Sequence, residues 1–293
     1  MRLEELVREL DDYFCVPDVE NDDWSGTFEE LYPEPYWREF AEPGYEGRWN
    51  GLLVRGGGQV ARAATCVFLS DEIVAGLEPD TLLFSEHPIA FEDDVEGFAP
   101  LARGSFERLR AEGISFYHAH APLDMHPEVS PSRLCAQGVG LTGLEEYFPI
   151  ADGIPGGAAI LGDSDLDLNE LAGRLRAYLG EEIPVEVLTR PRERAGRVAV
   201  VAGGGADRAI LEASLERGCE TYATGNAATA CRLDFVQEGV RNFRALAAEG
   251  NVALVDATHY GTEKPPQLAM VEWFRKRGLE AEFRPGRPER GAA

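Results

Sequence analysis

The segment from residue 198 to residue 224 reads VAVVAGGGADRAILEASLERGCETYAT, and its pattern indicates the fold class. The apolar run 198–202 predicts a strand, the three glycines predict a tight turn, and residues 206–217 predict a helix that Gly218 ends. Residues 219–224 predict the next strand. Strands and helices that alternate in this way are typical of an α/β fold with mixed or parallel sheets.

The first half of the chain shows the same alternation. Residues 51–55 and 59–68 are expected strands on either side of Gly56–Gly58, which predicts a hairpin turn. A short apolar strand is expected over residues 81–85, and Ser105 is expected to cap the helix that follows. The order of elements therefore resembles that of the second half.

This similarity indicates an internal duplication. Gly113 ends the expected helix before a strand at 114–120, as Gly218 does before the strand at 219–224. In that alignment Tyr117 matches Tyr222, although few other residues are identical. We therefore expect two related α/β halves, each with a mixed sheet.

The two ends of the chain complete the expected organisation. Residues 2–14 predict an amphipathic helix, and residues 15–48 are rich in acids, prolines and aromatics, which favours an ordered cap or lid. A last strand at 251–256 leads into a helix expected to begin near Thr262. The expected division is a cap at 1–48, a first half carrying the metal site at 49–135 plus 251–293, and a second half at 136–250.

Composition narrows the function classes. The 293 residues carry a formal net charge of −24, and Lys264 and Lys276 are the only lysines. A chain this acidic has no stripe of basic residues that could neutralise phosphate groups. We therefore expect neither a nucleic-acid nor a membrane partner. The N-terminal residues lack the apolar core of a secretory signal, and five scattered cysteines without a CxxC motif favour reduced thiols in the cytoplasm.

Four of the five histidines fall in three short sequence clusters that each contain a carboxylate. Imidazole nitrogen and carboxylate oxygen are ligands that Zn²⁺, Fe²⁺ and Mn²⁺ share. Three such clusters, each near an expected strand end, would supply enough donors for two divalent ions (Zn, Fe, Mn or Ni). The clusters are Glu86-His87-Pro88, His118-Ala-His120-Ala-Pro-Leu-Asp124 and His259-Tyr-Gly-Thr-Glu263.

Each cluster also has a structural explanation. His120 and Asp124 could form a hydrogen bond within a turn, and Glu263 could be an acid in a helix's first turn. Glu86 could bind a metal, or it could accept a hydrogen bond from a histidine that binds the metal. His118, His126, Tyr260 and Asn226 are candidate pocket residues, and His118 could instead bind metal. Gly203–Gly205 fits a tight turn better than a phosphate-binding loop.

The motifs together resemble the NIF-three-like dinuclear metal-centre family, also described as GTP cyclohydrolase I type 2 homologues. The family's His-His motif reads Glu86-His87 here, and its His-Thr-Asn-Leu-Asp motif reads His120-Ala-Pro-Leu-Asp124. Its late Gly-His-Tyr-x-x-Glu motif reads Thr258-His259-Tyr260-Gly-Thr-Glu263, and an early Asn-x-Gly-Leu stretch is echoed by Asn50-Gly-Leu52. The resemblance covers roughly residues 48–285.

The resemblance implies two intertwined α/β halves and a ring-shaped hexamer with metal pairs facing an inner cavity. It implies metal ligands at His87, His120 or its neighbourhood, Asp124, His259 and Glu263. Two departures matter, since Glu86 stands where the family usually has histidine and Asn226 stands where many relatives have glutamate.

Two functions follow as hypotheses. The first is a metal-dependent hydrolase of a small phosphorylated or nucleotide-like molecule, in which activated water rather than a side chain is the nucleophile. GTP cyclohydrolase-type activity is implied by the resemblance alone. The alternative is a non-catalytic metal-handling or assembly protein.

Overall fold

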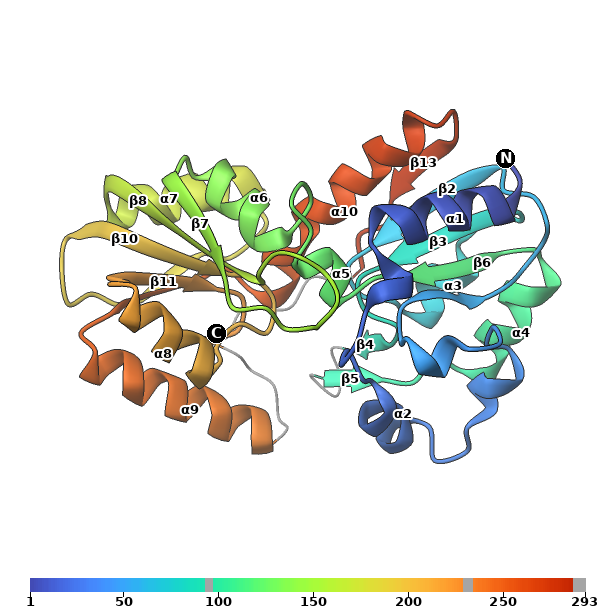
Figure 1. Ribbon diagram of the computed structural model, residues 1–293, viewed down its shortest axis with the longest axis horizontal. Coiled ribbons are helices and arrows are strands. Elements are labelled where there is room, and N and C mark those ends of the chain that lie inside the picture. The colour runs from blue at the N-terminus through green and yellow to red at the C-terminus, as the bar shows by residue number, and fades with distance from the viewer. Residues whose placement is uncertain (93–96, 229–233, 287–293) are drawn as a thin grey trace. The chain divides into compact units, whose positions relative to one another are not determined.

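The computed structural model describes residues 1–92, 97–228 and 234–286, which form a mixed α/β protein with two compact units (Figure 1). The first unit contains Met1–Leu123, Ile150–Ile154 and the described residues from Gln267 onward. The second contains Asp124–Pro149 and Pro155–Pro266. Within the described residues no helix combines the length and apolar character needed to span a membrane.

A five-stranded mixed sheet forms the centre of the first unit as described. Its strand order is β1-β6-β3-β2-β13, in which β2, β3, β6 and β13 run parallel to their neighbours and β1 is antiparallel to β6. The middle strands are buried on both faces, which explains why they read as apolar runs without alternation. The strands are β1 (Gly51–Val54), β2 (Arg62–Cys66), β3 (Thr81–Ser85), β6 (Ser115–His118) and β13 (Glu280–Phe283).

Short helices and the N-terminal segment surround this sheet. Residues 15–48 pack aromatic side chains into the core of the unit, with Phe28, Trp37 and Tyr45 at most 2% exposed. Burying such large rings stabilises the segment against the sheet. The elements are α1 (Leu3–Tyr13), η1 (Val16–Asp18), α2 (Ser25–Leu31), η2 (Tyr36–Glu39), η3 (Tyr45–Gly47), α3 (Asp71–Ala75), α4 (Arg103–Ala111) and the hairpin β4 (Ala90–Glu92) with β5 (Gly97–Ala99).

The second unit has a six-stranded mixed sheet in its described residues, ordered β7-β8-β10-β11-β12-β9. Strands β10, β11 and β12 run parallel, and β7, β8 and β9 are antiparallel to their neighbours. The strands are β7 (Thr142–Tyr147), β8 (Ala159–Asp167), β9 (Glu186–Thr189), β10 (Arg194–Val201), β11 (Thr221–Thr224) and β12 (Ala253–Asp256).

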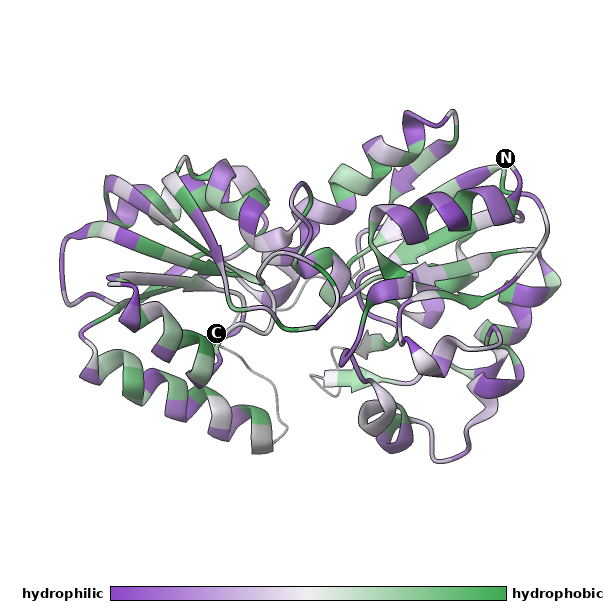
Figure 2. Ribbon diagram, viewed as in Figure 1, coloured by the Kyte–Doolittle hydropathy of each residue, from purple (hydrophilic) through white to green (hydrophobic). Residues whose placement is uncertain are grey.

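Helices cover both faces of this second sheet. In Figure 1, α6 and α7 lie on one face and α8 and α9 on the other. Figure 2 shows hydrophobic and hydrophilic residues interleaved along α8 and α9, as expected for helices with one buried side. The helices are α6 (Pro131–Gly138), α7 (Leu168–Leu179), α8 (Arg208–Glu216), α9 (Asp234–Glu249) and the start of α10 (His259–Arg275). The residues of α10 from Gln267 onward belong to the first unit, as do Ala121–Leu123 of α5 (Ala121–Asp124).

The strand order supports the duplication and changes its alignment. Strand β6 lies between antiparallel β1 and parallel β3, and β12 lies between antiparallel β9 and parallel β11. By these neighbours β6 corresponds to β12 and β3 to β11. The proposed match of Tyr117 with Tyr222 is therefore displaced by one strand and helix, because short βα repeats look alike in sequence.

Three local expectations differ from the structure. Gly56–Gly58 is not a hairpin turn, because β1 pairs with β6 and β2 pairs with β3. A Cβ at Gly56 would lie 2.3 Å from the carbonyl carbon of Gly113, so glycine instead permits close contact between two loops. Ser105 lies inside α4 and donates a hydrogen bond to Asp71 rather than capping the helix.

The third difference concerns the domain boundaries. The expected first half joins residues 49–135 to 251–293, whereas β12 pairs in the sheet of the second unit and β13 in that of the first.

The described cysteines Cys15, Cys66, Cys135 and Cys219 are free thiols, and Cys231 lies outside the described residues.

Candidate metal centre

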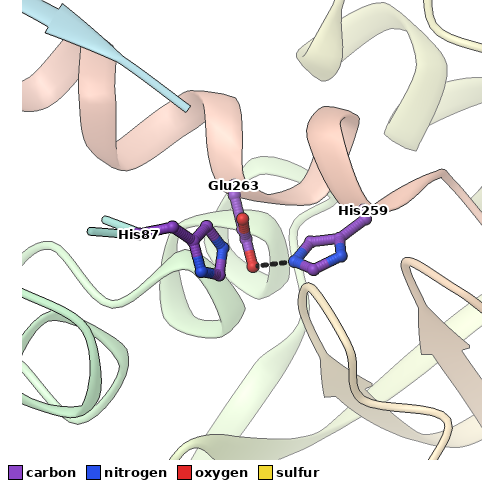
Figure 3. Close-up of side chains that lie close together, drawn as sticks. All are labelled: His87, His259 and Glu263. Atoms are coloured by element: carbon purple, nitrogen blue, oxygen red, sulfur yellow. Dashed lines mark ion pairs between the residues drawn. The ribbon is translucent and has the colours of Figure 1, made fainter. Parts of the chain in front are cut away.

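His259 and Glu263 face each other across one turn of α10. The helix begins at His259 rather than near Thr262, which places the two residues four positions apart on one face. His259 Nε2 and Glu263 Oε1 lie 2.7 Å apart (Figure 3). Glu263 is 3% exposed, so its carboxylate is held by local partners rather than by water.

Local interactions fix where α10 begins. The Gly261 N–H donates to Thr258 Oγ1 at 3.0 Å, which caps the first turn. Thr258 has φ 60°, a left-handed conformation unusual for a β-branched residue, and it immediately precedes His259. Pro266 cannot donate to the Thr262 carbonyl one turn back, and the Cys135 thiol donates to that carbonyl at 3.5 Å.

The triple-glycine turn after β10 lies against the His259–Glu263 pair. Gly203 has φ 61°, and a Cβ there would lie 2.0 Å from Glu263 Oε1 and 3.2 Å from His259 Nε2. Its N–H donates to Thr262 Oγ1 at 2.8 Å, which ties the turn to α10. Glycine at this position is therefore required both by the backbone conformation and by the space around the ligand atoms.

His87 follows β3 in the first unit and is 3% exposed. Its ring packs on Phe68 in a stacked arrangement at 5.4 Å and against the edge of Trp24 at 5.9 Å. Glu86, directly before it, has no exposed surface. A buried carboxylate requires compensation by a cation or by hydrogen bonds, which is compatible with either role expected for Glu86.

His120 is held by Asp22 of the N-terminal segment and by Asn50. Its Nδ1 lies 3.1 Å from Asp22 Oδ1, and its backbone N–H donates to Asn50 Oδ1 at 2.8 Å. Burial works to raise the pKa of Asp22, but the adjacent His120 ring and donors from Asn50 and Ala121 outweigh it and hold the pKa below the usual range. The Trp24 ring meets that of His120 edge-on at 4.8 Å.

His259 and Glu263 are the ligand-type side chains that the second unit brings together, and Figure 3 draws them with His87, the candidate ligand of the first unit. An imidazole and a carboxylate suit Zn²⁺, Fe²⁺ or Mn²⁺, and Gly203 leaves space beside them, so these residues fit a divalent ion. The ligation expected of His87, Glu86, His120 and Asp124 stays a prediction.

The expected pocket residues have varied surroundings. His118 is fully buried, its Nε2 lies 2.6 Å from the Tyr45 hydroxyl, and burial lowers its pKa to about 3. His126 Nδ1 accepts hydrogen bonds from the N–H groups of Glu128 and Val129, so it caps a turn. Tyr260 is 3% exposed on α10. Asn226 Oδ1 accepts from the Ala206 N–H at 2.7 Å and so connects the loops after β10 and β11.

Sequence reasoning missed Asp22 and Trp24. Both lie in the acidic, aromatic segment that we interpreted only as a cap. The run Asn-Asp-Asp-Trp at 21–24 is the signal that was available, since it places acids beside a large ring. Without the fold, nothing in the sequence connects that run to His120.

A family comparison accounts for the motif order. The profile described as Duf34/NIF3 (NGG1p interacting factor 3) matches residues 35–284. The chain belongs to the Duf34/NIF3 family. Residues 22 and 24 precede the part of the chain that matches the family profile.

Duf34/NIF3 relatives from bacteria and archaea share moderate identity with the chain. A Nostoc protein named GTP cyclohydrolase 1 type 2 homolog is 29% identical over 207 residues, covering 68% of this chain and 70% of its own. A protein of the same name from Archaeoglobus fulgidus is 27% identical over 237 residues, covering 80% and 87%.

Solved structures support the fold of the Duf34/NIF3 chain. The protein ybgI, described as of unknown function, has a TM-score of 0.67 at 20% identity and covers 99% of this chain and 100% of its own. Reduced HcgD from Methanocaldococcus jannaschii has a TM-score of 0.65 at 18% identity, with 97% of both chains covered.

Proposed function

We propose that this Duf34/NIF3 protein binds two divalent metal ions and hydrolyses a small phosphorylated or nucleotide-like molecule. The observation that carries the proposal is the His259–Glu263 pair at the start of α10, whose Nε2 and Oε1 atoms lie 2.7 Å apart beside Gly203. The name GTP cyclohydrolase 1 type 2 homolog, borne by relatives, supports a nucleotide-like substrate.

The chain's own residues would hold the ions and limit access to them. Glu263 and His259 would provide a carboxylate oxygen and an imidazole nitrogen from one helix turn, and His87 would provide a second imidazole. Asp124, His120 and Glu86 remain the proposed ligands for completing two ions. The aromatic rings packed on His87 would keep bulk water from its ring.

Divalent ions at this position would supply Lewis acidity toward an oxygen of the substrate. Their charge also matters for recognition, because the chain carries a formal net charge of −24 and would otherwise repel an anionic substrate. This is why a metal-free form should bind phosphorylated compounds weakly.

The test combines metal analysis with a substrate panel. Purified protein would be loaded separately with Zn²⁺, Mn²⁺, Fe²⁺ and Ni²⁺, and metal per chain would be measured by mass spectrometry. Each form would then be assayed against nucleotides and small phosphoesters. We expect turnover that disappears with chelator and with Glu263→Gln, and persists in Glu272→Gln, an exposed acid of the same helix paired with Arg275.

The outcomes separate the two functional hypotheses. Stoichiometric metal without turnover on any substrate would favour the metal-handling alternative. Absence of bound metal in the wild-type protein would reject both.

The proposal extends to assembly, partners and location. We propose a homo-oligomer, a hexamer by family resemblance, with a small-molecule substrate and without nucleic-acid or membrane partners. We also propose a cytoplasmic location, which the free thiols of the four described cysteines favour.

A further inference from the structure

Asp22 lies beside His120 in the first unit, and hydrogen-bonding groups surround its carboxylate. Its Oδ1 lies 3.1 Å from His120 Nδ1, and its side chain is 9% exposed. Its Oδ2 accepts hydrogen bonds from Asn50 Nδ2 at 2.7 Å and from the Ala121 N–H at 3.1 Å. One carboxylate oxygen of Asp22 therefore faces the His120 ring, and the other accepts two hydrogen bonds.

The groups around Asp22 leave it little freedom. Asn50 is fully buried and also accepts from the His120 N–H, so the same amide holds both the carboxylate and the backbone of the histidine. Trp24, two residues after Asp22, is 8% exposed and meets the His120 ring edge-on. The ring is thus fixed from one side by a carboxylate and from another by an indole.

We propose that Asp22 is a positioning residue that keeps the proton of His120 on Nδ1 and so presents the Nε2 lone pair as a donor to a divalent ion. A carboxylate that accepts from one imidazole nitrogen fixes both the tautomer and the orientation of the ring. This inference rests on the proposed function for its metal step, but the tautomer itself is a property of the metal-free chain.

The support from Asp22 comes from outside the part of the chain that matches the family profile. The family profile matches residues 35–284, and Asp22 and Trp24 precede that match. The N-terminal segment therefore adds a support for a motif histidine that the matched part of the chain does not provide by itself.

The substitution Asp22→Asn tests the tautomer directly. Asparagine offers one acceptor oxygen where aspartate offers two, and two donors, Asn50 Nδ2 and the Ala121 N–H, compete for it. That oxygen should stay with them and turn the new NH₂ toward His120. The ring must then accept at Nδ1 and carry its proton on Nε2, as occurs when the aspartate of a serine protease triad is replaced by asparagine.

The tautomer would be read by ¹⁵N NMR of histidine-labelled, metal-free protein, in which only five rings contribute. His120→Gln identifies the His120 signals. We expect Nδ1–H in the wild type and Nε2–H in Asp22→Asn, with a mixture in Asp22→Ala as the second variant. Asp23→Asn is the matched control, since this exposed neighbour carries the same charge and should leave the tautomer unchanged.

Metal affinity provides the second readout. Replacing a residue that supports a liganding histidine typically weakens metal binding by about 10–100-fold. We expect metal affinity to fall by that factor in Asp22→Asn and to stay unchanged in Asp23→Asn. Competition with a chelating dye measures the affinity of each variant.

Each outcome decides the inference. A wild-type His120 protonated on Nε2, or an unchanged tautomer in Asp22→Asn and Asp22→Ala, would overturn the positioning role. A changed tautomer with unchanged metal affinity would overturn the metal step. If wild-type protein binds no metal, the proposed function and that step fail, and the tautomer measurement alone decides the positioning role.

Discussion

Glu263 is the residue on which the proposed centre depends most. It is 3% exposed, and its oxygen lies 2.7 Å from His259 Nε2. The carboxylate and the imidazole together offer a divalent ion two of its common ligand types on one turn of α10.

The first prediction concerns removal of this ligand. Glu263→Gln keeps the size of the side chain but removes its charge, so metal affinity should fall by more than about 10-fold while the fold persists. Asp124→Ala should act similarly if Asp124 is a ligand. Metal per chain by mass spectrometry and folding by circular dichroism are the measurements. Wild-type metal content in Glu263→Gln would reject the site.

The second prediction concerns Glu86, where the family usually has histidine. A carboxylate ligand favours harder ions than imidazole does, so Glu86→His should raise zinc occupancy relative to Mn²⁺. The measurement is competition of the two metals for wild-type and variant protein. An unchanged preference would assign Glu86 to a supporting role or remove it from the site.

The third prediction concerns the pH dependence of stability. Burial raises the pKa of Asp11 from 3.8, although Tyr117 donates a hydrogen bond to it at 3.0 Å. Because the folded-state pKa is raised, the contribution of Asp11 to stability is present below its unfolded value and is lost as pH rises through the folded value. Asp11→Asn should therefore stabilise the protein at pH 7 and matter little near pH 3.8.

The expected size is a rise in Tm of about 1–3 °C at pH 7. Asp12→Asn, an exposed neighbour with the same charge change, should raise Tm by less, because Asp12 is the smallest of the influences that raise the pKa of Asp11. Thermal unfolding at both pH values would measure this. Equal effects of the Asp11 substitution at the two pH values would contradict the argument.

At the scale of elements, the site in the second unit is formed by a helix start and a turn. The first turn of α10 carries His259, and the turn after β10 brings Gly203 against it. Thr262 connects the two, because its Oγ1 accepts from the Gly203 N–H. The glycine run is therefore explained by close packing rather than by phosphate binding.

The fourth prediction tests this packing with two neighbouring glycines. Gly203→Ala would place a Cβ 2.0 Å from Glu263 Oε1 on a backbone with φ 61°, whereas a Cβ at Gly204 would have nothing within 4 Å. We expect Gly203→Ala to displace Glu263 and lower metal affinity by at least about 10-fold. Gly204→Ala should bind metal as the wild type does. Equal affinity in both variants would show that the turn does not constrain the ligands.

At the scale of the whole molecule, charge is the dominant property. Each chain carries a formal net charge of −24, so association of identical chains is opposed by their mutual repulsion. Any interface must bury enough apolar surface to overcome it.

The fifth prediction follows for the proposed hexamer. Salt screens repulsion over about 10 Å at 0.1 M, so assembly should strengthen as ionic strength rises. Light scattering across a range of salt and protein concentrations measures the effect. A monomer under all conditions would contradict the proposal, and an oligomer that dissociates on adding salt would indicate that its contacts are ionic.

The fold class, the family and the order of the ligand-bearing motifs could all be predicted from the amino-acid sequence. These depend on local signals, namely apolar runs, glycines after helices and short motifs such as His120 to Asp124, which need no knowledge of distant contacts. Strand partners needed the tertiary structure, because β1 and β2 are adjacent in sequence yet bond to different neighbours. The start of α10 was also decided by packing, since Thr258, Cys135 and Gly203 together hold a turn that the two prolines would discourage. Only the fold connects Asp22 with His120, because a hydrogen bond between residues 98 positions apart leaves no periodic trace in a sequence.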